Sequence, residues 1–330
     1  MGGASHEREI SLLSGATMYG HLAPARYERR ALDLVGPGVV RLRPAGDDLA
    51  ARSWEEFPTM PLIRAFDELL AWGIDVAVLA LHGSGGEDGA IQGFLQTLGI
   101  PYTHSGVRGS AVSMDKILTR RLYQAFGIPT APGVEVEAGD DIARALAEAG
   151  LVLPVILKPP CLGSSFEVYI AETDEQLREA FARLAALDRR VLVEKYITGR
   201  EFTCCVFQPA PDQQPQALAV TEIVPVASRF FDFRAKYTAG ASNEITPAEI
   251  DAALARRLQD IARQCHSILQ CESVSRTDMI MNGDGAVYIL ETNAIPGMTE
   301  TSILPQAAAH AGMSLEQLLD AMVAFARSRS

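Results

Sequence analysis

Residues 276–299 read RTDMIMNGDGAVYILETNAIPGMT, and this stretch decides how the chain is interpreted. A β-branched and apolar run precedes and follows the turn Asn282–Gly285, which predicts a β-hairpin. Each strand carries two polar residues two positions apart, so each pair lies on one face of the sheet. These residues are Arg276 and Asp278 on the first strand, and Glu291 and Asn293 on the second.

Two carboxylates and an amide oxygen on one face form the kind of oxygen-rich site that Mg²⁺ prefers, usually together with substrate phosphates. A solvent-exposed hairpin face with a surface ion pair is the alternative interpretation. The loop Pro296–Thr299 favours the metal site, because glycine at 297 lets the backbone approach a ligand closely.

The N-terminal third alternates strand and helix patterns. Residues 38–42 predict a strand and 61–72 a helix, while the apolar run 75–81 predicts a strand buried on both faces of a parallel sheet. A glycine-rich loop, 82–89, follows that run, and a helix is expected from Ala90. This order places a functional loop at the carboxyl edge of a sheet, where open α/β folds bind ligands.

The pattern changes after residue 110. A helix is expected over 110–126, and a long loop without periodicity over 228–246. Further strands are expected at 154–159, 191–197, 201–207 and 217–225, and further helices at 246–271 and, interrupted by Gly312, at 301–327.

Charge and composition exclude several classes of protein. The 330 residues include 41 acidic and 29 basic side chains, a net charge of −12, which argues against non-specific binding to nucleic acid or anionic membranes. The chain has no apolar run of about 18 residues and no signal-peptide pattern, so we expect a cytoplasmic protein. Five cysteines without CxxC spacing indicate reduced, structural thiols.

Several motifs in order resemble those of the D-alanine–D-alanine ligases, members of the ATP-grasp superfamily. The resemblance covers nearly the whole chain and includes the stretch 276–299. Its other motifs are Gly2–Ser11, Leu81–Gly89 with Gln92-Gly93, Pro101–Thr103, Ser113–Lys116, Lys158-Pro159, Gly163–Ser165, Ala235–Tyr237 and Ser302–Pro305.

The resemblance implies an α/β fold of the α+β ATP-grasp type. An N-terminal substrate-binding parallel-sheet domain, 1–109, would precede two ATP-grasp subdomains, 110–203 and 204–330. The nucleotide would lie between the sheets of the two subdomains, and the loop 228–246 would close over it. The family usually has an apolar strand before the Gly-Gly pair, but here Gly2 follows Met1 directly, so this first strand is missing from the sequence. Either the start site is placed too late or the first sheet lacks its central strand; we expect the former, because losing a buried parallel strand would expose apolar neighbours.

The resemblance also implies a role for each matching residue. ATP would be bound by Lys116, Lys158, Ser165, Glu194, Glu201 and Lys236. Two Mg²⁺ ions, or Mn²⁺, would be bound by Asp278, Glu291 and Asn293. Substrate binding and catalysis would use Glu7, His82, Ser164, Tyr237, Arg276, Gly297 and Ser302. For His82 a capping or loop-packing role is the alternative.

The implied reaction joins two D-alanines through an acyl phosphate, for peptidoglycan precursor synthesis, in a homodimer that binds neither nucleic acid nor membrane. A ligase for other amino acids in a biosynthetic pathway, or an inactive nucleotide-binding homologue, are the alternatives. Glu167 keeps the last one open, because the family has glycine at that position and a glutamate there could repel the triphosphate.

Overall fold

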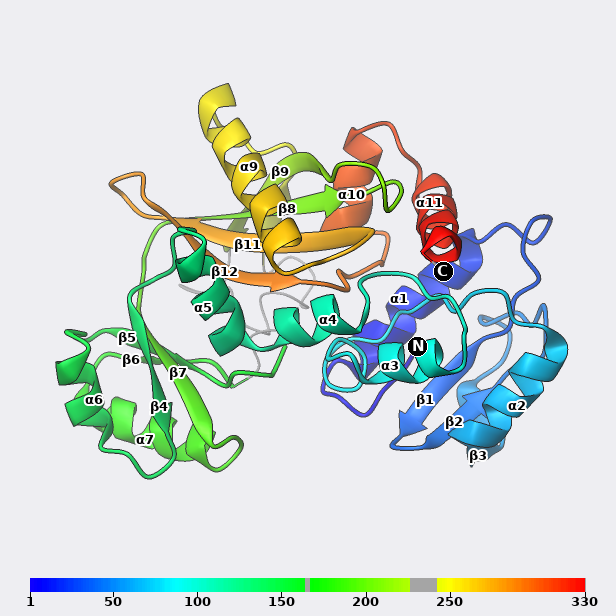
Figure 1. Cartoon of the computed structure of the whole chain (residues 1–330), viewed down its shortest axis with the longest axis horizontal. Helices are drawn as coiled ribbons and strands as arrows, with labels where there is room; N and C mark the ends of the chain where they lie inside the picture. The colour runs from blue at the N-terminus through cyan, green and yellow to red at the C-terminus, as the bar shows by residue number, and fades with distance from the viewer. Residues whose placement is uncertain (164–166, 226–241, 330) are drawn as a thin grey trace.

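The computed structural model describes residues 1–163, 167–225 and 242–329. Three sheets follow one another along the chain: a three-stranded sheet, a four-stranded sheet and a five-stranded sheet. The last two face each other across the middle of the molecule, and the first lies beside them (Figure 1). Within the described ranges, no helix has the length and apolar character needed to cross a membrane.

The first sheet is antiparallel, with the order β1-β2-β3. The predicted strand at 38–42 is β2 (Val39–Leu42), and the predicted helix at 61–72 is α2 (Leu62–Trp72). The other elements of this region are α1 (Arg8–His21), β1 (Leu32–Gly36), the 3-10 helix η1 (Trp54–Glu56), β3 (Thr59–Pro61) and α3 (Ala90–Thr97).

The run 75–81, which the sequence predicts as a strand of a parallel sheet, forms no ladder. It makes one parallel bridge, from Ala77 to Tyr102, and a second isolated parallel bridge joins Gly2 to Leu34. The parallel sheet expected here is therefore reduced to isolated bridges beside an antiparallel sheet. The physical reason is that, among the described residues, 75–81 has a backbone partner only on the edge that faces Tyr102.

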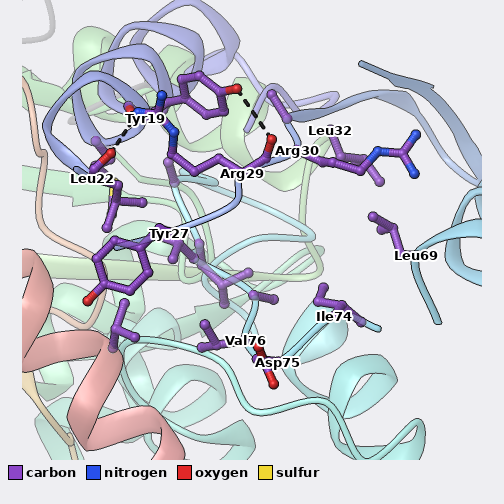
Figure 2. Close-up of a pocket in the computed structure, with 18 of the residues that line it drawn as sticks. Tyr19, Leu22, Tyr27, Arg29, Arg30, Leu32, Leu69, Ile74, Asp75 and Val76 are labelled. Atoms are coloured by element: carbon purple, nitrogen blue, oxygen red, sulfur yellow. Dashed lines mark hydrogen bonds between the residues drawn. The ribbon is translucent and has the colours of Figure 1, made fainter. Parts of the chain in front are cut away.

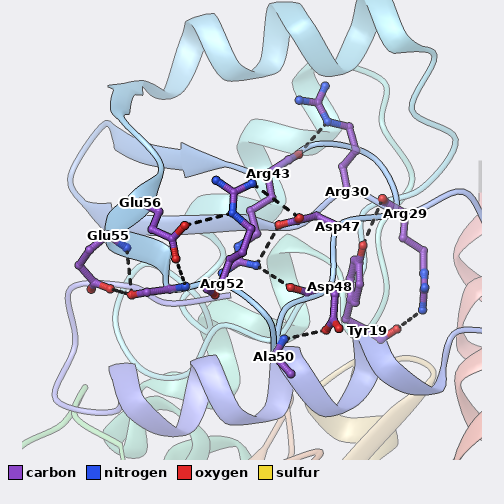
Figure 3. A network of polar contacts seen from close by, with 11 residues as sticks. Tyr19, Arg29, Arg30, Arg43, Asp47, Asp48, Ala50, Arg52, Glu55 and Glu56 are labelled. Atoms are coloured by element: carbon purple, nitrogen blue, oxygen red, sulfur yellow. Dashed lines mark hydrogen bonds and ion pairs between the residues drawn. The ribbon is translucent and has the colours of Figure 1, made fainter.

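A buried arginine holds the loop between β2 and β3 in place (Figure 3). The Arg43 side chain is fully buried; its Nη1 donates to Asp47 Oδ2 at 2.9 Å, and its Nη2 donates to the carbonyl of Arg52. The guanidinium also lies 4.5 Å from the Trp54 ring centroid. These contacts offset the cost of burying the charge.

The four-stranded sheet has the order β4-β7-β5-β6 and is entirely antiparallel. Its strands include those predicted at 154–159 and 191–197, and two helices cover one face with an apolar core that contains Leu157, Phe181 and Leu184. The elements are β4 (Gly133–Glu137), α6 (Ile142–Glu148), β5 (Val155–Lys158), β6 (Tyr169–Ala171), α7 (Asp174–Ala185) and β7 (Arg190–Lys195).

The single helix expected over 110–126 is two helices. They are α4 (Val107–Met114) and α5 (Lys116–Ala125), separated at Asp115. The Asp115 side chain accepts hydrogen bonds from the backbone of Ile117 and Leu118, which caps α5. The break fixes the position of Lys116 at the start of α5.

The five-stranded antiparallel sheet has the order β10-β9-β8-β11-β12. Cys204 contacts the core beneath α9, whereas Cys205 contacts the core beneath α10 and α11, so neighbouring residues serve opposite faces. The elements are β8 (Arg200–Phe207), β9 (Gln216–Pro225), β10 (Ser242–Ile245), α9 (Ala252–Ile268), β11 (Val274–Met281), β12 (Val287–Asn293), α10 (Ile303–His310) and α11 (Leu315–Ser328). All five cysteines are free thiols, as predicted.

Two sequence-based boundaries are wrong. The helix expected from residue 246 begins at Ala252, where the Asp251 side chain caps it. The end of the loop expected over 228–246 is strand β10, which pairs with β9. Most of that loop, 226–241, lies outside the described residues.

Candidate active site

The predicted hairpin is present, and its polar residues are direct cross-strand neighbours. Asp278 pairs with Glu291, and Arg276 pairs with Asn293. A register shift follows Asp278, so β12 contains one residue more than β11 at this point. The hairpin therefore holds the two carboxylates opposite each other.

Arg276 forms a bidentate contact with Asp278. Its Nε and Nη2 each lie 2.9 Å from an Asp278 carboxylate oxygen. Burial alone would lower the pKa of Arg276, but the charges of Asp278 and Glu291 outweigh it and raise the pKa above its ordinary value. Arg276 is thus a permanent cation at this site. Thr203 on β8 also donates to Asp278 Oδ1, at 2.6 Å, a contact that the sequence did not indicate.

Two lysines from the other side of the cleft line the same cavity as these carboxylates, and one of them contacts Glu291. Lys116 Nζ lies 3.4 Å from Glu291 Oε2 and donates to the carbonyl of Leu162 at 2.7 Å. Lys158, at the end of β5, donates to Glu194 on β7 at 2.9 Å. Both lysines are mostly buried, and they line a cavity of about 370 Å³ between the two sheets, together with Asp278 and Glu291.

The same cavity continues to the residues expected to hold the adenosine. Glu194 and Glu201 line it, along with the connecting segment 195–200. Ala131, Ile156 and Ile280 supply apolar surface, so the cavity combines apolar walls with charged groups. This is the usual composition of a pocket that binds a small molecule.

Donor chemistry at the hairpin fits a divalent metal. Asp278 and Glu291 offer hard oxygen atoms from directly opposite positions, and Asn293 adds an amide oxygen one pair further along. The Asn293 amide oxygen already accepts from the backbone of Ile295 at 2.8 Å, which fixes its orientation. No cluster of three His, Cys, Asp or Glu side chains occurs in the part of the chain that the structure describes.

His82 lies in a buried network that joins three segments. Its Nε2 is 3.1 Å from Ser14 Oγ, and the same hydroxyl accepts from the backbone of Met298 at 3.3 Å. Burial lowers the pKa of His82 to about 4, so it is neutral at pH 7. The loop-packing alternative therefore has direct contacts in its favour, because His82 contacts Ser14 of α1, and Ser14 in turn contacts the loop that contains Gly297.

Glu7 and Glu87 form an acidic pair, in which Glu87 belongs to the glycine-rich loop 82–89. Glu87 Oε2 accepts from the backbone of Gly83 at 2.6 Å. Burial, followed by the nearby charge of Glu7, raises the pKa of Glu87 well above its usual range. A Cβ on Gly163 would lie 2.6 Å from Glu7 Oε2, so this glycine permits close approach. The motifs predicted no role for Glu87, although an acidic residue among glycines was a usable signal.

The remaining predicted residues divide into two groups. Ser302 directly precedes α10, and its Oγ accepts a hydrogen bond from the backbone N–H of Thr299 at 3.0 Å. A Cβ on Gly297 would lie 2.9 Å from the same Oγ. Four predicted residues lie outside the described residues: Ser164, Ser165, Lys236 and Tyr237.

Glu167 adopts a left-handed backbone conformation, with φ of 55°, which is the conformation that glycine favours. Its Oε2 accepts from the hydroxyl of Tyr169 on β6. The carboxylate is therefore engaged with β6, and repulsion of a triphosphate by Glu167 stays a prediction.

Two facing antiparallel sheets with lysines and a carboxylate hairpin around the cleft define an ATP-grasp fold. Comparisons with known proteins identify one family within this fold. Models of the D-ala D-ala ligase N-terminus and C-terminus match residues 1–105 and 122–324. The chain belongs to the D-alanine–D-alanine ligase family.

Individual relatives agree over the full length. A D-alanine–D-alanine ligase of Syntrophobacter fumaroxidans is 43% identical, over 98% of this chain and 95% of that protein. The solved structure of the Coxiella burnetii ligase has a TM-score of 0.79 at 26% identity, over 99% of this chain and 92% of that one. The solved structure of the Bacillus anthracis ligase complexed with ATP has a TM-score of 0.77 at 29% identity. The match covers 100% of this chain and 97% of that one.

Proposed function

We propose that the protein is an ATP-dependent ligase that joins two D-alanines to D-alanyl-D-alanine, for the synthesis of peptidoglycan precursors. The observation that carries this proposal is the pairing of Asp278 with Glu291 at one end of the cleft, with Lys116 and Lys158 beside them. Family membership, at about 40% identity to curated D-alanine–D-alanine ligases, supplies the substrate.

The first step phosphorylates the carboxylate of one D-alanine. Lys116 and Lys158 neutralise negative charge on the phosphates of ATP, which lowers the barrier to phosphoryl transfer. Glu194, which accepts from Lys158, and Glu201 hold the adenosine in the same cavity. Asp278, Glu291 and Asn293 would hold divalent metal, proposed as two Mg²⁺ ions, which would neutralise further phosphate charge.

The second step forms the peptide bond. The amine of a second D-alanine attacks the acyl carbon, and phosphate leaves with the electrons of the C–O bond. Arg276 and the Gly297 N–H stabilise the negative charge that develops on the carbonyl oxygen. Ser302 binds the carboxylate of the second D-alanine, and Glu7 orients the first with the help of His82, Ser164 and Tyr237.

The proposal includes a division of labour along the chain. Segment 1–109 contributes to binding of the first substrate, while 110–203 and 204–330 enclose ATP, with Ser165 and Lys236 completing the phosphate site. Three separate sheets support this division. We also propose a cytoplasmic homodimer, on the strength of the family resemblance.

Phosphate release tests the activity. Purified protein with ATP and Mg²⁺ is expected to release phosphate when D-alanine is added, and to form D-alanyl-D-alanine in equal amount. L-Alanine, glycine, D-serine and D-lactate serve as comparison substrates. Phosphate release that is no faster with D-alanine than without it, or that is faster with another substrate, contradicts the proposal.

A further inference from the structure

A row of polar side chains crosses the five-stranded sheet at the level of the proposed metal site. On β11, Asp278 has Glu291 of β12 on one side and Thr203 of β8 on the other. Thr203 in turn pairs with Thr221 of β9. Residues directly opposite each other on neighbouring strands point to the same face of a sheet. The row therefore continues from the proposed metal ligands into two threonines.

The two threonines have different hydrogen-bond partners. Thr203 Oγ1 lies 2.6 Å from Asp278 Oδ1 and 3.4 Å from the carbonyl oxygen of Thr277. Because a hydroxyl has a single hydrogen to donate, the shorter contact identifies Asp278 as its acceptor. Thr221 instead bonds to the hydroxyl of Thr246, at 2.6 Å. Thr203 and Thr221 are both fully buried, so their partners are what distinguishes them.

The hydrogen bonds to Asp278 leave its carboxylate able to make one further contact. An ionised carboxylate has about four lone-pair positions, two on each oxygen. At Oδ1, Thr203 occupies one position and Arg276 Nε the other, while at Oδ2 Arg276 Nη2 occupies one. The last position, on Oδ2, has no partner within the described residues. Asp278 can therefore offer a cation one of its oxygen atoms, but not both.

Thr203 ties this carboxylate to a strand outside the hairpin. Arg276 and Asp278 lie on the same strand, β11, whereas Thr203 lies on β8. Asp278 is buried, and a buried carboxylate oxygen that loses its donor costs free energy. Without the Thr203 hydroxyl, the carboxylate would turn toward another donor, and Oδ2 would leave its present position.

We propose that Thr203 is a positioning residue for the metal site: its hydroxyl fixes Asp278 so that Oδ2 alone is presented to a divalent cation. This inference rests on the proposed metal site, and it adds to that site the number of oxygen atoms that Asp278 supplies. The same contacts leave three of the five N–H groups of Arg276 without a partner within the described residues. Those groups are the ones that its proposed part in the second step requires.

Substitutions at Thr203 and at its neighbour in the row test the inference. Thr203→Val keeps the shape of the side chain and removes the hydroxyl, Thr203→Cys keeps a weak donor, and Thr203→Ser keeps the hydroxyl. Thr221→Val is the matched control, because it makes the same change at an equally buried position on the neighbouring strand.

A second control lies in the N-terminal region, beside a separate cavity of about 480 Å³ (Figure 2). There the Tyr19 hydroxyl donates to the carbonyl of Arg29 at 3.4 Å, as Figure 2 shows. None of the three proposed metal ligands lines that cavity. Tyr19→Phe therefore removes a hydroxyl that has no contact with the metal site.

Electron paramagnetic resonance of free Mn²⁺ measures metal binding without turnover, in the presence of a non-hydrolysable ATP analogue. We expect Thr203→Val to weaken Mn²⁺ binding by at least about tenfold, the loss that is usual when a residue orienting a metal ligand is changed. Thr203→Cys should show a smaller loss, and Thr203→Ser should stay within about threefold of the unmodified protein. Thr221→Val and Tyr19→Phe should bind Mn²⁺ as the unmodified protein does.

Urea unfolding separates the positioning of Asp278 from a general loss of stability. Thr203→Val and Thr221→Val should both lower the urea midpoint, because each leaves a buried partner without its hydrogen bond. Unchanged Mn²⁺ affinity in Thr203→Val, or an equal loss of affinity in Thr221→Val, would overturn the inference and leave the proposed metal site standing. If the unmodified protein bound no Mn²⁺ with the nucleotide analogue, the proposed metal site would fail and this inference with it.

Discussion

Glu291 lies opposite Asp278 and within 3.4 Å of Lys116, so its charge acts on both sides of the cleft. Glu291→Gln keeps the shape and removes one negative charge from the proposed metal site. We expect turnover to fall by at least about 100-fold, which corresponds to about 2.7 kcal/mol of barrier, with a higher metal requirement.

Asp284→Asn is the control for that substitution, because it makes the same chemical change in the exposed turn of the same hairpin. Its turnover should equal that of the unmodified protein. The circular dichroism spectra of both variants should also be unchanged. Turnover of Glu291→Gln within about threefold of the unmodified protein would refute the assignment.

The buried side chain of His266 makes the stability of the protein depend on pH. It is buried, its Nδ1 is 2.8 Å from Ser275 Oγ, and burial lowers its pKa to about 4. Between pH 6.5 and 4 the unfolded chain binds a proton at this residue and the native chain does not, so stability falls as pH falls through this range. The contribution lost between pH 7 and 5 is about 2 kcal/mol.

His266→Gln should remove this part of the acid sensitivity, measured as the free energy of unfolding in urea at pH 7 and pH 5. His310→Gln, at an exposed position on α10, should leave it unchanged. If the loss between the two pH values were as large in His266→Gln as in the unmodified chain, His266 would not be its source.

At the scale of elements, the cap of α5 carries a prediction because it also places Lys116. Asp115 caps α5 and lies 3.1 Å from Arg190 on β7, whereas Asp141 caps α6 through Ala143 and Arg144. Asp115→Ala and Asp141→Ala should each lower stability by about 1 kcal/mol. Only Asp115→Ala should weaken ATP binding, by at least about threefold.

Isothermal titration with a non-hydrolysable ATP analogue measures this difference, and urea unfolding measures the common loss of stability. Equal affinity in the two variants would show that the cap of α5 has no part in positioning Lys116.

The same cap explains why the single helix predicted over 110–126 is two helices in the structure. An aspartate in a run of helical periodicity serves as a cap, which periodicity alone does not detect.

At the scale of the whole molecule, Ser14 joins the first and last thirds of the chain. Its hydroxyl contacts His82 and the backbone of Met298, next to Gly297. Ser14→Ala leaves both groups buried without this partner, at a cost of about 1–3 kcal/mol. We expect KM for D-alanine to rise as well, because the loop at 297 loses its contact with α1.

Ser110→Ala is the matched substitution, since Ser110 is also buried and, within the described residues, its hydroxyl donates to the nearby Ser105 carbonyl. It should lower stability without changing KM for D-alanine. A Ser14→Ala enzyme with unchanged KM would mean that the two regions are joined for stability alone.

The sequence by itself determined the hairpin and its chemistry. Strand periodicity places Arg276 and Asp278 on one face of their strand, and Glu291 and Asn293 on one face of theirs. The extra residue of β12, which only the structure shows, brings the two pairs opposite each other. The order of motifs then indicated the family and several residues that line the cavity between the sheets, including Lys158 and Glu194. Confirmed elements such as α2 and β8 follow from the same short-range patterns.

Only the tertiary structure decided which residues from distant segments meet. Glu87 lies against Glu7, Thr203 bonds to Asp278, and Ser14 bridges His82 and Met298, contacts that depend on packing between elements far apart in the sequence. The run 75–81 has the composition of a buried strand, but a strand also needs hydrogen-bonding partners. Within the described residues its backbone pairs with 101–103 around Ala77 alone, so the ladder that its sequence predicts does not form.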